Sequence, residues 1–338
     1  MIPHTRNPGY SPVRVGVVGV GEFGIVHART AAGVAEAHLA ALVDSNENRL
    51  KSALSEFPDA PGWTSFGQAV QECDVEAWII AASTASHVSL AQTVLAAGKS
   101  VLLDKPIADN LSEAMTLEPL VSPDSSNLML GHVVLFNSEY RELLREVRHR
   151  GPIVYIDCVR HRPATTLDAY PGESPFHLTM IHDLYLLLVL MNRAEPIRMS
   201  AQTHVTPDGR CDLALAQLQW ESGALASLSA SFLTPPGMAA DGFDRMEVFG
   251  QGWAARLQPN PRPIEVWDSR ARWPFALEVR TEPHAASGML ADQLRCFCRV
   301  VRGIEPVPMG ATYHDAVQLQ RWIEQLQTAA STQSQLQD

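Results

Sequence analysis

The stretch GVGEFG at residues 19–24 has a glycine spacing that suits dinucleotide binding. It follows the apolar run VRVGVV and precedes a helical stretch, the setting in which G-x-G-x-x-G binds a pyrophosphate at a helix N-terminus. The next apolar run ends in Asp44, 20 residues after Gly24, where a carboxylate can bind the ribose hydroxyls. We therefore expect the cofactor to be bound by Gly19, Gly21, Glu22, Phe23, Gly24 and Asp44.

The residues around Asp44 favour NAD over NADP as this cofactor. The carboxylate of Asp44 would repel the 2′-phosphate of NADP, and the neighbouring Ser45 carries no compensating positive charge. Arg49 is the nearby cation that argues the other way. We expect NAD, with NADP as the less favoured alternative.

A lysine follows the apolar run VLLD at residues 101–104 and stands directly before Pro106. If this run is a strand of a parallel sheet, its carboxyl end lies at the crevice where such sheets bind ligands. An ammonium group there can polarise a carbonyl or orient an alcohol beside a nicotinamide, and hydride transfer needs a group that moves the alcohol proton. Lys105 is thus a catalytic candidate, and a solvated turn lysine is the alternative.

Two polar residues, His182 and Asp183, interrupt the apolar sequence ESPFHLTMIHDLYLLLVLM at residues 173–191, which predicts a helix. Polar side chains on such a helix must be hydrogen-bonded or functional. Histidine suits proton transfer because its unperturbed pKa lies near neutrality. For both residues, a purely structural hydrogen bond remains the alternative.

Two kinds of architecture must position these candidates. Up to about residue 134, short apolar runs alternate with helices, which is typical of a parallel sheet with helices on both faces. After about residue 152, strands separated by turns such as ESG and GQG indicate an open, mostly antiparallel sheet, and two helices close the chain. We expect an α/β Rossmann domain followed by an α+β domain. The predicted divisions are a flexible arm at 1–12, a Rossmann NAD-binding domain at 13–134, a substrate and oligomerisation domain at 135–328 and a flexible tail at 329–338.

The stretch from Asp74 to Pro106 resembles the Gfo/Idh/MocA oxidoreductases. Members of that family have a strand ending in ATPxxxH, a helix ending in AGK and a strand ending in EKP. This chain has the corresponding segments Ala82-Ser83 with His87, Ala97-Gly98-Lys99, and Asp104-Lys105-Pro106. GHVVLFNSEYRELL at 131–144 is similar to the family's GHxxRFNPxxxxL, and the closing helices are similar too, so the resemblance covers roughly residues 13–327.

The resemblance implies an NAD(P)-dependent dehydrogenase or reductase that acts on a secondary alcohol of a sugar, polyol or nucleotide sugar. GHVVLFN and IHDL look more like the UDP-N-acetyl-sugar 3-dehydrogenases than the inositol dehydrogenases. Proton transfer falls to Lys105 and to His182, the histidine of the family's D-x-x-x-H. Further contacts are implied with the cofactor for Ser83, His87, Asp104 and Lys105, and with the substrate for Asn137, Arg160 and Asp183. A helix contact for His87 and a solvated strand end for Arg160 remain open.

The chain departs from the family pattern at three places near the candidate catalytic residues. Asp104 replaces a glutamate and is one methylene shorter, so any contact of that carboxylate must be rebuilt. The acid of D-x-x-x-H falls on Leu178, and neighbouring His177 cannot simply substitute, because one residue turns an α-helix by about 100°. Tyr185 stands where the family's longer version of this motif, HDIDLL, has a second acid. The acid that orients His182 is therefore missing or comes from elsewhere.

Two other functions of the same fold remain open. One is a glycosidase that uses NAD to oxidise C3 transiently and permit elimination. The other is a non-catalytic NAD-binding sensor, which Leu178 keeps in consideration, although Lys105 and His182 argue against it because a sensor needs no proton donor.

Composition limits the partners. Of 338 residues, 26 are Lys or Arg and 37 are Asp or Glu, so the net charge of −11 argues against nucleic-acid binding. The five cysteines form no CxxC pair, which indicates reduced thiols. Reduced thiols are typical of a reducing compartment, so we expect a cytoplasmic protein. No apolar run is long enough for a bilayer, and no cluster has metal-ligand spacing. The open apolar sheet predicts a homodimer or homotetramer through the C-terminal sheet.

Overall fold

The computed structural model describes residues 9–235, 238, 242–260, 266–267, 271–272, 279–282 and 285–335. Contacts divide the chain into two compact units. Unit 1 comprises Met1–Asn137 and Leu277–Gln320, and unit 2 comprises Ser138–Ala276 and Arg321–Asp338. Residues 1–8 of the predicted arm and 336–338 of the predicted tail lie outside the described residues.

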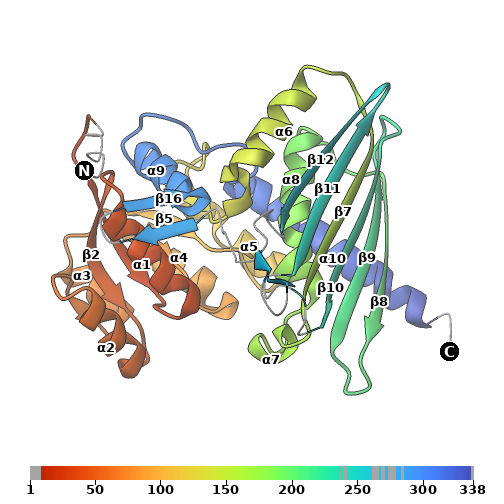
Figure 1. The fold of residues 1–338 in the computed structure, drawn as a ribbon. Helices are drawn as coiled ribbons and strands as arrows, with labels where there is room; N and C mark the ends of the chain where they lie inside the picture. The colour runs from red at the N-terminus through yellow and green to blue at the C-terminus, as the bar shows by residue number, and fades with distance from the viewer. Residues whose placement is uncertain are drawn as a thin grey trace. The chain divides into compact units, whose positions relative to one another are not determined.

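Unit 1 is built on a parallel sheet with the strand order β3-β2-β1-β4-β5-β6, which is the order of a dinucleotide-binding α/β fold (Figure 1). Its strands are β1 (Val13–Val18), β2 (Ala37–Val43), β3 (Gly62–Trp63), β4 (Ala77–Ile80), β5 (Ser100–Leu103) and β6 (Leu128–Leu130). Its helices are α1 (Glu22–Gly33), α2 (Glu47–Glu56), α3 (Phe66–Glu72), α4 (Thr84–Ala96), α5 (Leu111–Met115) and the 3-10 helices Glu118–Leu120 and Val133–Phe136. The predicted parallel α/β domain is confirmed.

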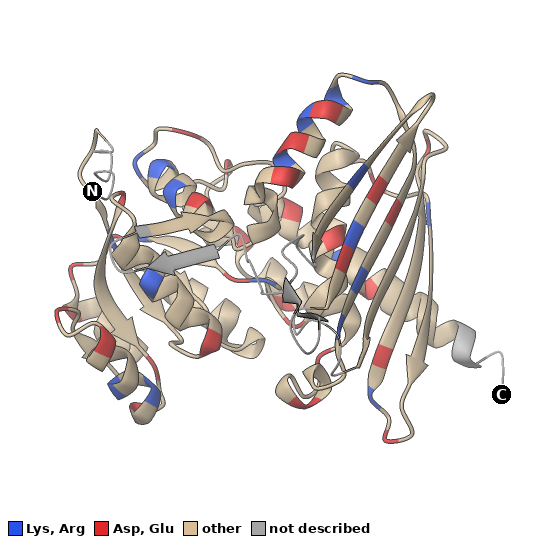
Figure 2. Ribbon diagram, in the orientation of Figure 1, with Lys and Arg blue, Asp and Glu red and all other residues tan. Residues whose placement is uncertain are grey.

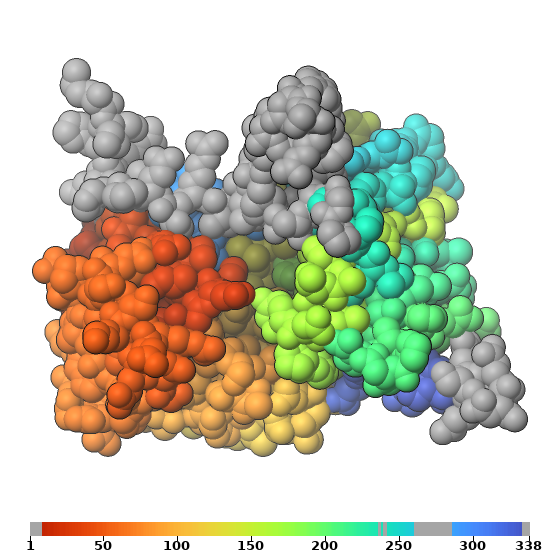
Figure 3. Space-filling view, turned by 60° about the horizontal axis from the view of Figure 1, so that its bottom comes forward, coloured from red at the N-terminus to blue at the C-terminus, as the bar shows by residue number. Residues whose placement is uncertain are grey.

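Apolar side chains on both sides of this sheet explain why its strands read as continuous apolar runs. Trp78 and Ile80 of β4 pack with Val94 of α4 and Ala69 of α3 in one buried cluster. Asn46 caps α2 by accepting hydrogen bonds from the amides of Asn48 and Arg49, which fixes where that helix begins. The outer faces of α2 and α3 form part of the surface, coloured orange in Figure 3.

Unit 1 also includes β15 (Val279–Glu282), β16 (Ala285–Gly288), α9 (Met289–Val301) and the first part of α10 (Tyr313–Gln335). This differs from the predicted division, which placed both closing helices in the second domain. The physical reason is burial within unit 1: α9 contacts α1, and Tyr313 lies in the core of the parallel sheet. The hydroxyl of Tyr313 donates to the carbonyl of Ala114 at 3.2 Å.

Unit 2 is built on a sheet with the strand order β12-β11-β7-β10-β9-β8. β7 and β10 are parallel and the other neighbouring pairs are antiparallel, which confirms the predicted mostly antiparallel sheet. The strands are β7 (Ile153–Pro163), β8 (Arg198–Val205), β9 (Cys211–Gln219), β10 (Leu225–Thr234), β11 (Phe243–Gly250) and β12 (Trp253–Asn260), with a separate pair β13 (Val266–Trp267) and β14 (Ala271–Arg272). The helices are α6 (Ser138–Arg148), α7 (Thr166–Ala169), the π-helical turn Phe176–Met180, α8 (Ile181–Leu190) and the end of α10.

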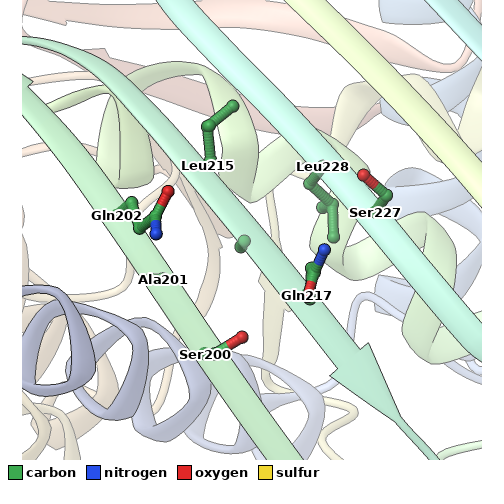
Figure 4. A pocket seen from close by; sticks show the side chains of 8 residues that line it. Ser200, Ala201, Gln202, Leu215, Gln217, Ser227 and Leu228 are labelled. Carbon is green, nitrogen blue, oxygen red and sulfur yellow. The ribbon is translucent and has the colours of Figure 1, made fainter. Parts of the chain in front are cut away.

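One face of the second sheet is covered by helices, and the other is open (Figure 1). Burial alternates along β9 and β10, so that every second side chain faces the helices. Acidic and basic residues lie side by side on β7, β11 and β12 (Figure 2), where Arg245 pairs with Asp157 and Arg256 with Glu247. On the open face, Ser200, Gln202, Leu215, Gln217 and Ser227 line a hollow of about 250 Å³ (Figure 4).

Some predicted helix bounds differ from the structure. The helix expected over 173–191 begins instead as the π-helical turn, and α8 follows it. The helix α5 ends at Met115 and a short 3-10 helix follows, because the ring of Pro119 cannot continue an α-helix. Helix α10 extends to Gln335, into the segment 329–338 that was predicted as a flexible tail. Among the described residues, no helix has the length and apolar character needed to cross a membrane.

Candidate active site

The glycine turn between β1 and α1 has the geometry expected from its sequence. Gly19 has φ of 84°, in the left-handed region that glycine tolerates. A Cβ at Gly24 would lie 1.6 Å from the carbonyl oxygen of Gly19, so only glycine allows this approach of helix and turn. A Cβ at Gly21 would meet no atom within 4 Å, so the space before the N-terminus of α1 is open. This open space beside free helix amides fits a pyrophosphate.

Asp44 follows β2 and holds the glycine turn in place. Its carboxylate is buried, and it accepts hydrogen bonds from the amides of Val20 at 2.9 Å and Asn46 at 2.8 Å. A carboxylate has further acceptor capacity, so a ribose hydroxyl can still bind. Glu22 and Phe23 form the first turn of α1, and the exposed Phe23 ring lies edge-on to His27, with centroids 4.9 Å apart.

Lys105 lies just beyond the carboxyl end of β5, as its sequence position predicted. The carboxylate of Asp104 accepts a hydrogen bond from the backbone amide of Lys105 at 2.8 Å, and the amide of Asp104 donates to the carbonyl of Ile80. The Lys105–Pro106 peptide bond is cis. The carboxylate of Asp104, which is one methylene shorter than the family's glutamate, thus hydrogen-bonds to the backbone of Lys105.

His87 supports the same segment from α4. Its ring is buried, with Nδ1 2.7 Å from the carbonyl oxygen of Pro106 and Nε2 3.1 Å from that of Ala82. Both ring nitrogens therefore face backbone carbonyls, which agrees with the helix-contact alternative for His87 better than with a cofactor contact. Ser83, by contrast, is exposed at the N-cap of α4, where its hydroxyl lies 3.2 Å from that of Ser86.

His132 belongs to this neighbourhood and was not singled out from the sequence. It follows β6 and is buried, with Nδ1 hydrogen-bonded to the carbonyl oxygen of Gly310. Burial lowers the pKa of His132 to about 4, although the nearby carboxylates of Asp315 and Asp104 oppose this shift and Lys105 adds to it. The signal available in the sequence was its place in GHVVLFN, between a strand and a run of buried residues.

His182 lies on α8 in unit 2 and is partly buried. Its Nδ1 lies 2.7 Å from the hydroxyl oxygen of Tyr185, and the two rings meet edge-on at 5.6 Å. Tyr185 is fully buried. The tyrosine noted as a departure from the family pattern is thus the hydrogen-bond partner of the candidate histidine.

The π-helical turn before α8 changes the spacing assumed for His182. A π-turn closes i→i+5 hydrogen bonds, so the side-chain spacing before His182 differs from that of a regular α-helix. The expectation that His177 cannot substitute for an acid at position 178 rested on regular α-helical spacing, which this turn does not have. Nδ1 of His177 lies 3.5 Å from the side-chain amide of Gln327.

Arg160 and Asp183, both predicted to contact substrate, are bonded to each other in a buried network. The Arg160 guanidinium donates to both carboxylate oxygens of Asp183, at 2.8 and 3.1 Å, and to Asp244 at 2.9 Å. Arg162 donates to Asp244 as well, at 2.6 Å. This arrangement joins α8 to β7 and β11. It agrees with the structural hydrogen bond given as the alternative for Asp183, whereas Arg160 is buried and is not the solvated strand end given as its alternative. The side chain of Asn137 is also buried, and the backbone N–H of this residue donates to the backbone carbonyl of Val134.

No group of three or more His, Cys, Asp or Glu suited to a metal ion occurs in the described part of the chain.

The candidate site residues form two sets, one in each unit. Unit 1 holds the glycine turn, Asp44 and Lys105, and unit 2 holds the His182–Tyr185 pair.

Two family models match the chain. Residues 13–132 match the oxidoreductase family with an NAD-binding Rossmann fold, GFO/IDH/MocA, and residues 129–255 match the GFO/IDH/MocA C-terminal domain. These matches fall on the glycine turn, Lys105 and the strands of the second sheet.

Curated proteins and solved structures resemble the chain as well. Inositol 2-dehydrogenase 1 from Saccharopolyspora erythraea is 28% identical over 193 residues, 56% of this chain and only 57% of that protein. UDP-N-acetylglucosamine 3-dehydrogenase from Acidithiobacillus ferrooxidans is 28% identical over 228 residues, 65% of this chain and 67% of that protein. The scyllo-inositol dehydrogenase of Lactobacillus casei, solved with NAD(H) and scyllo-inositol, has a TM-score of 0.81 at 20% identity, covering 95% of this chain and 98% of its own. This last likeness shows a shared fold.

Proposed function

Because the chain belongs to the Gfo/Idh/MocA oxidoreductase family, with its NAD-binding Rossmann fold, we propose that it is an NAD-dependent dehydrogenase or reductase. The proposed substrate is a secondary alcohol, or the corresponding ketone, of a sugar, polyol or nucleotide sugar. The names of the two curated relatives, an inositol and a UDP-sugar dehydrogenase, support this class.

The observation that carries the proposal is that Lys105 and a complete dinucleotide turn lie at the carboxyl edge of the same parallel sheet. Bound NAD supplies the acceptor for the hydride that leaves the alcohol carbon. Gly19, Gly21 and Gly24 leave room for the pyrophosphate, and the acid at Asp44 favours a ribose without a 2′-phosphate. Glu22, Phe23, Ser83 and Asp104 remain proposed cofactor contacts.

In alcohol oxidation, the C–H bond breaks with its electron pair leaving as hydride, and the hydroxyl proton must pass to a base. We assign that proton to the ring of His182, while the ammonium of Lys105 stabilises the oxygen as its negative charge develops. In the reverse reaction the same ring returns the proton to the alkoxide oxygen. Asn137 remains a proposed substrate contact, whereas the buried pairing of Arg160 and Asp183 favours a structural role for both.

The proposal is tested by mixing the protein with NAD and a panel of inositols, sugars and UDP-sugars. NADH formation at 340 nm is expected with at least one substrate, and NADP in parallel is expected to give a lower kcat/KM. Absence of NADH formation, together with absence of ketone reduction by NADH, would contradict the proposal. Hydrolysis of a glycoside without net NADH would instead favour the glycosidase alternative.

We also propose a homodimer or homotetramer formed through the open face of the second sheet. Leu215 and Leu225 are exposed apolar residues on this face, and the hollow beside Leu215 offers amide and hydroxyl groups (Figure 4). Sedimentation velocity tests it: Leu215→Asp is expected to lower the oligomeric state. All five cysteines are free, in keeping with the proposed cytoplasmic location.

A further inference from the structure

We propose that Tyr185 is the positioning residue for His182, taking over from the acid that this chain lacks at Leu178. The proposal rests on the proposed role of His182 in proton transfer. It goes further by naming the group that holds the ring and by predicting how that group changes the chemistry.

The geometry of the pair supports this role. The hydroxyl oxygen of Tyr185 lies 2.7 Å from Nδ1 of His182, which leaves Nε2 as the nitrogen that does not face Tyr185. The two residues are three apart on α8, the spacing at which side chains on a helix meet. Tyr185 is fully buried, so its hydroxyl has a strong requirement for a partner and its ring has little freedom to move.

The direction in which α8 presents His182 is fixed by contacts on the same helix. Asp183, next in sequence, is held by the bidentate hydrogen bonds from Arg160 of β7. The hydroxyl of Tyr140 donates to the carbonyl of Leu186 at 3.0 Å, which ties α6 to α8. The hydrogen bonds from Arg160 to Asp183 therefore set the rotation of α8 about its axis, Tyr140 holds α6 against α8, and Tyr185 sets the ring of His182.

A tyrosine hydroxyl differs chemically from the carboxylate it replaces. A carboxylate only accepts, so it favours the tautomer with the proton on Nδ1, whereas a hydroxyl donates or accepts and can serve both tautomers. Nε2 of His182 is a base in the tautomer with the proton on Nδ1, in which the hydroxyl of Tyr185 accepts, and the imidazolium that returns the proton keeps the same contact. A neutral hydroxyl also stabilises the imidazolium less than a carboxylate does, so the ring releases its proton more readily.

Other charged groups surround the pair and are shared by all variants in the test. Arg160 of β7 lies within electrostatic range of Tyr185, and it is itself paired with Asp183 of α8 and Asp244 of β11. Arg162 also pairs with Asp244, and His177 lies on the π-helical turn that precedes His182. Because Tyr185→Phe leaves these groups in place, its effect reports on the hydroxyl.

The test compares Tyr185→Phe with Tyr140→Phe in the full-length protein, using a substrate identified in the NADH assay. Both changes remove one buried tyrosine hydroxyl that bonds to α8, but only the first bonds to His182. Tyr185→Phe is expected to lower kcat about 10- to 100-fold, a part of the usual contribution of acid–base catalysis, with substrate KM and NAD affinity nearly unchanged. It should also displace the pH–rate profile. Tyr140→Phe should keep kcat and the profile of the wild-type protein.

Two further measurements separate this proposal from the proposed function. His182→Gln is expected to lose at least as much kcat as Tyr185→Phe; full activity in His182→Gln would overturn the role of His182 and this proposal with it. An impaired His182→Gln beside a Tyr185→Phe that matches Tyr140→Phe would overturn the role of Tyr185 alone. Independently of turnover, the ¹⁵N signals of the His182 ring should shift in Tyr185→Phe, and unchanged signals would refute the contact.

Discussion

Nδ1 of His87 lies 2.7 Å from the carbonyl oxygen of Pro106, the residue that follows Lys105. The other nitrogen of the ring lies 3.1 Å from the carbonyl oxygen of Ala82, just beyond β4, so one buried side chain joins the segments that follow β4 and β5. Carbonyl oxygens only accept hydrogen bonds, so the N–H of the ring donates to one of these two carbonyl oxygens and the other nitrogen lies in contact with the second. His87 thereby fixes the backbone on which Lys105 is carried.

His87→Leu is therefore expected to lower kcat about 10- to 100-fold, because a small displacement of a reacting group has effects of that size. NAD affinity, measured by calorimetric titration, should stay within about twofold, since the ring is buried and faces backbone. Ser89→Ala is the comparison variant and should behave as wild type, because Ser89 is exposed on the same helix. Weaker NAD binding with unchanged kcat in His87→Leu would restore the sequence-based expectation of a cofactor contact.

Lys105→Ala is expected to reduce kcat by about 10²- to 10³-fold, the usual range for loss of one group that stabilises a developing negative charge on oxygen. NAD affinity should change little, because the dinucleotide turn and Asp44 remain intact. Turnover is measured by NADH formation and NAD binding by calorimetry. Lys51→Ala, which removes an exposed lysine of α2, is the control and should behave as wild type. A fully active Lys105→Ala would remove this lysine from the mechanism.

Much of unit 1 follows from local sequence, and this explains why the sequence predicted it well. The turn at Gly19–Gly24 and the acid at Asp44 depend on spacing along the chain and on a fold with a fixed strand order. The position of Lys105 depends only on where β5 ends. Each of these features is set by a short segment and by the direction of a parallel strand.

The features that the sequence did not predict depend on distant partners or on unusual helix geometry. Arg160 meets Asp244 across 84 positions, and sequence spacing gives no sign of such a pairing between strands. The partner of His182 is Tyr185 in the next turn, whereas the family motif D-x-x-x-H directed attention to position 178. The π-helical turn before His182 has no recognisable signal in the sequence, so the change of register became evident only in the structure.

The buried network at Arg160 is expected to stabilise unit 2 rather than bind substrate. Arg160→Met would leave the buried carboxylates of Asp183 and Asp244 short of a cation, which costs about 3–5 kcal/mol in unfolding free energy. Arg210→Ala breaks the exposed pair with Asp168 and should cost at most about 1 kcal/mol. Chemical denaturation measures both. A raised substrate KM with normal stability in Arg160→Met would instead support the substrate contact first expected for this arginine.

The buried histidine beside Lys105 should make the stability of unit 1 depend on pH. Burial lowers the pKa of His132 to about 4, whereas an unfolded chain has a histidine pKa of about 6.5. Between these values the unfolded chain binds a proton that the folded chain does not. The stabilising effect is therefore complete above about pH 6.5 and is lost as pH falls towards 4, by about 3 kcal/mol in all.

His132→Asn should remove this dependence while keeping a side-chain donor for the carbonyl of Gly310. The free energy of unfolding is measured by denaturant titration at pH 7.5 and at pH 4.5. Its decrease between these two pH values should be about 2–3 kcal/mol smaller in this variant than in the wild-type protein. Carboxylates that titrate in the same range are common to both proteins and cancel in the comparison. His149→Asn, at an exposed position after α6, should retain the wild-type dependence. If the free energy of unfolding decreases equally in His132→Asn and in the wild-type protein, the pKa of His132 is the same in the folded and the unfolded chain.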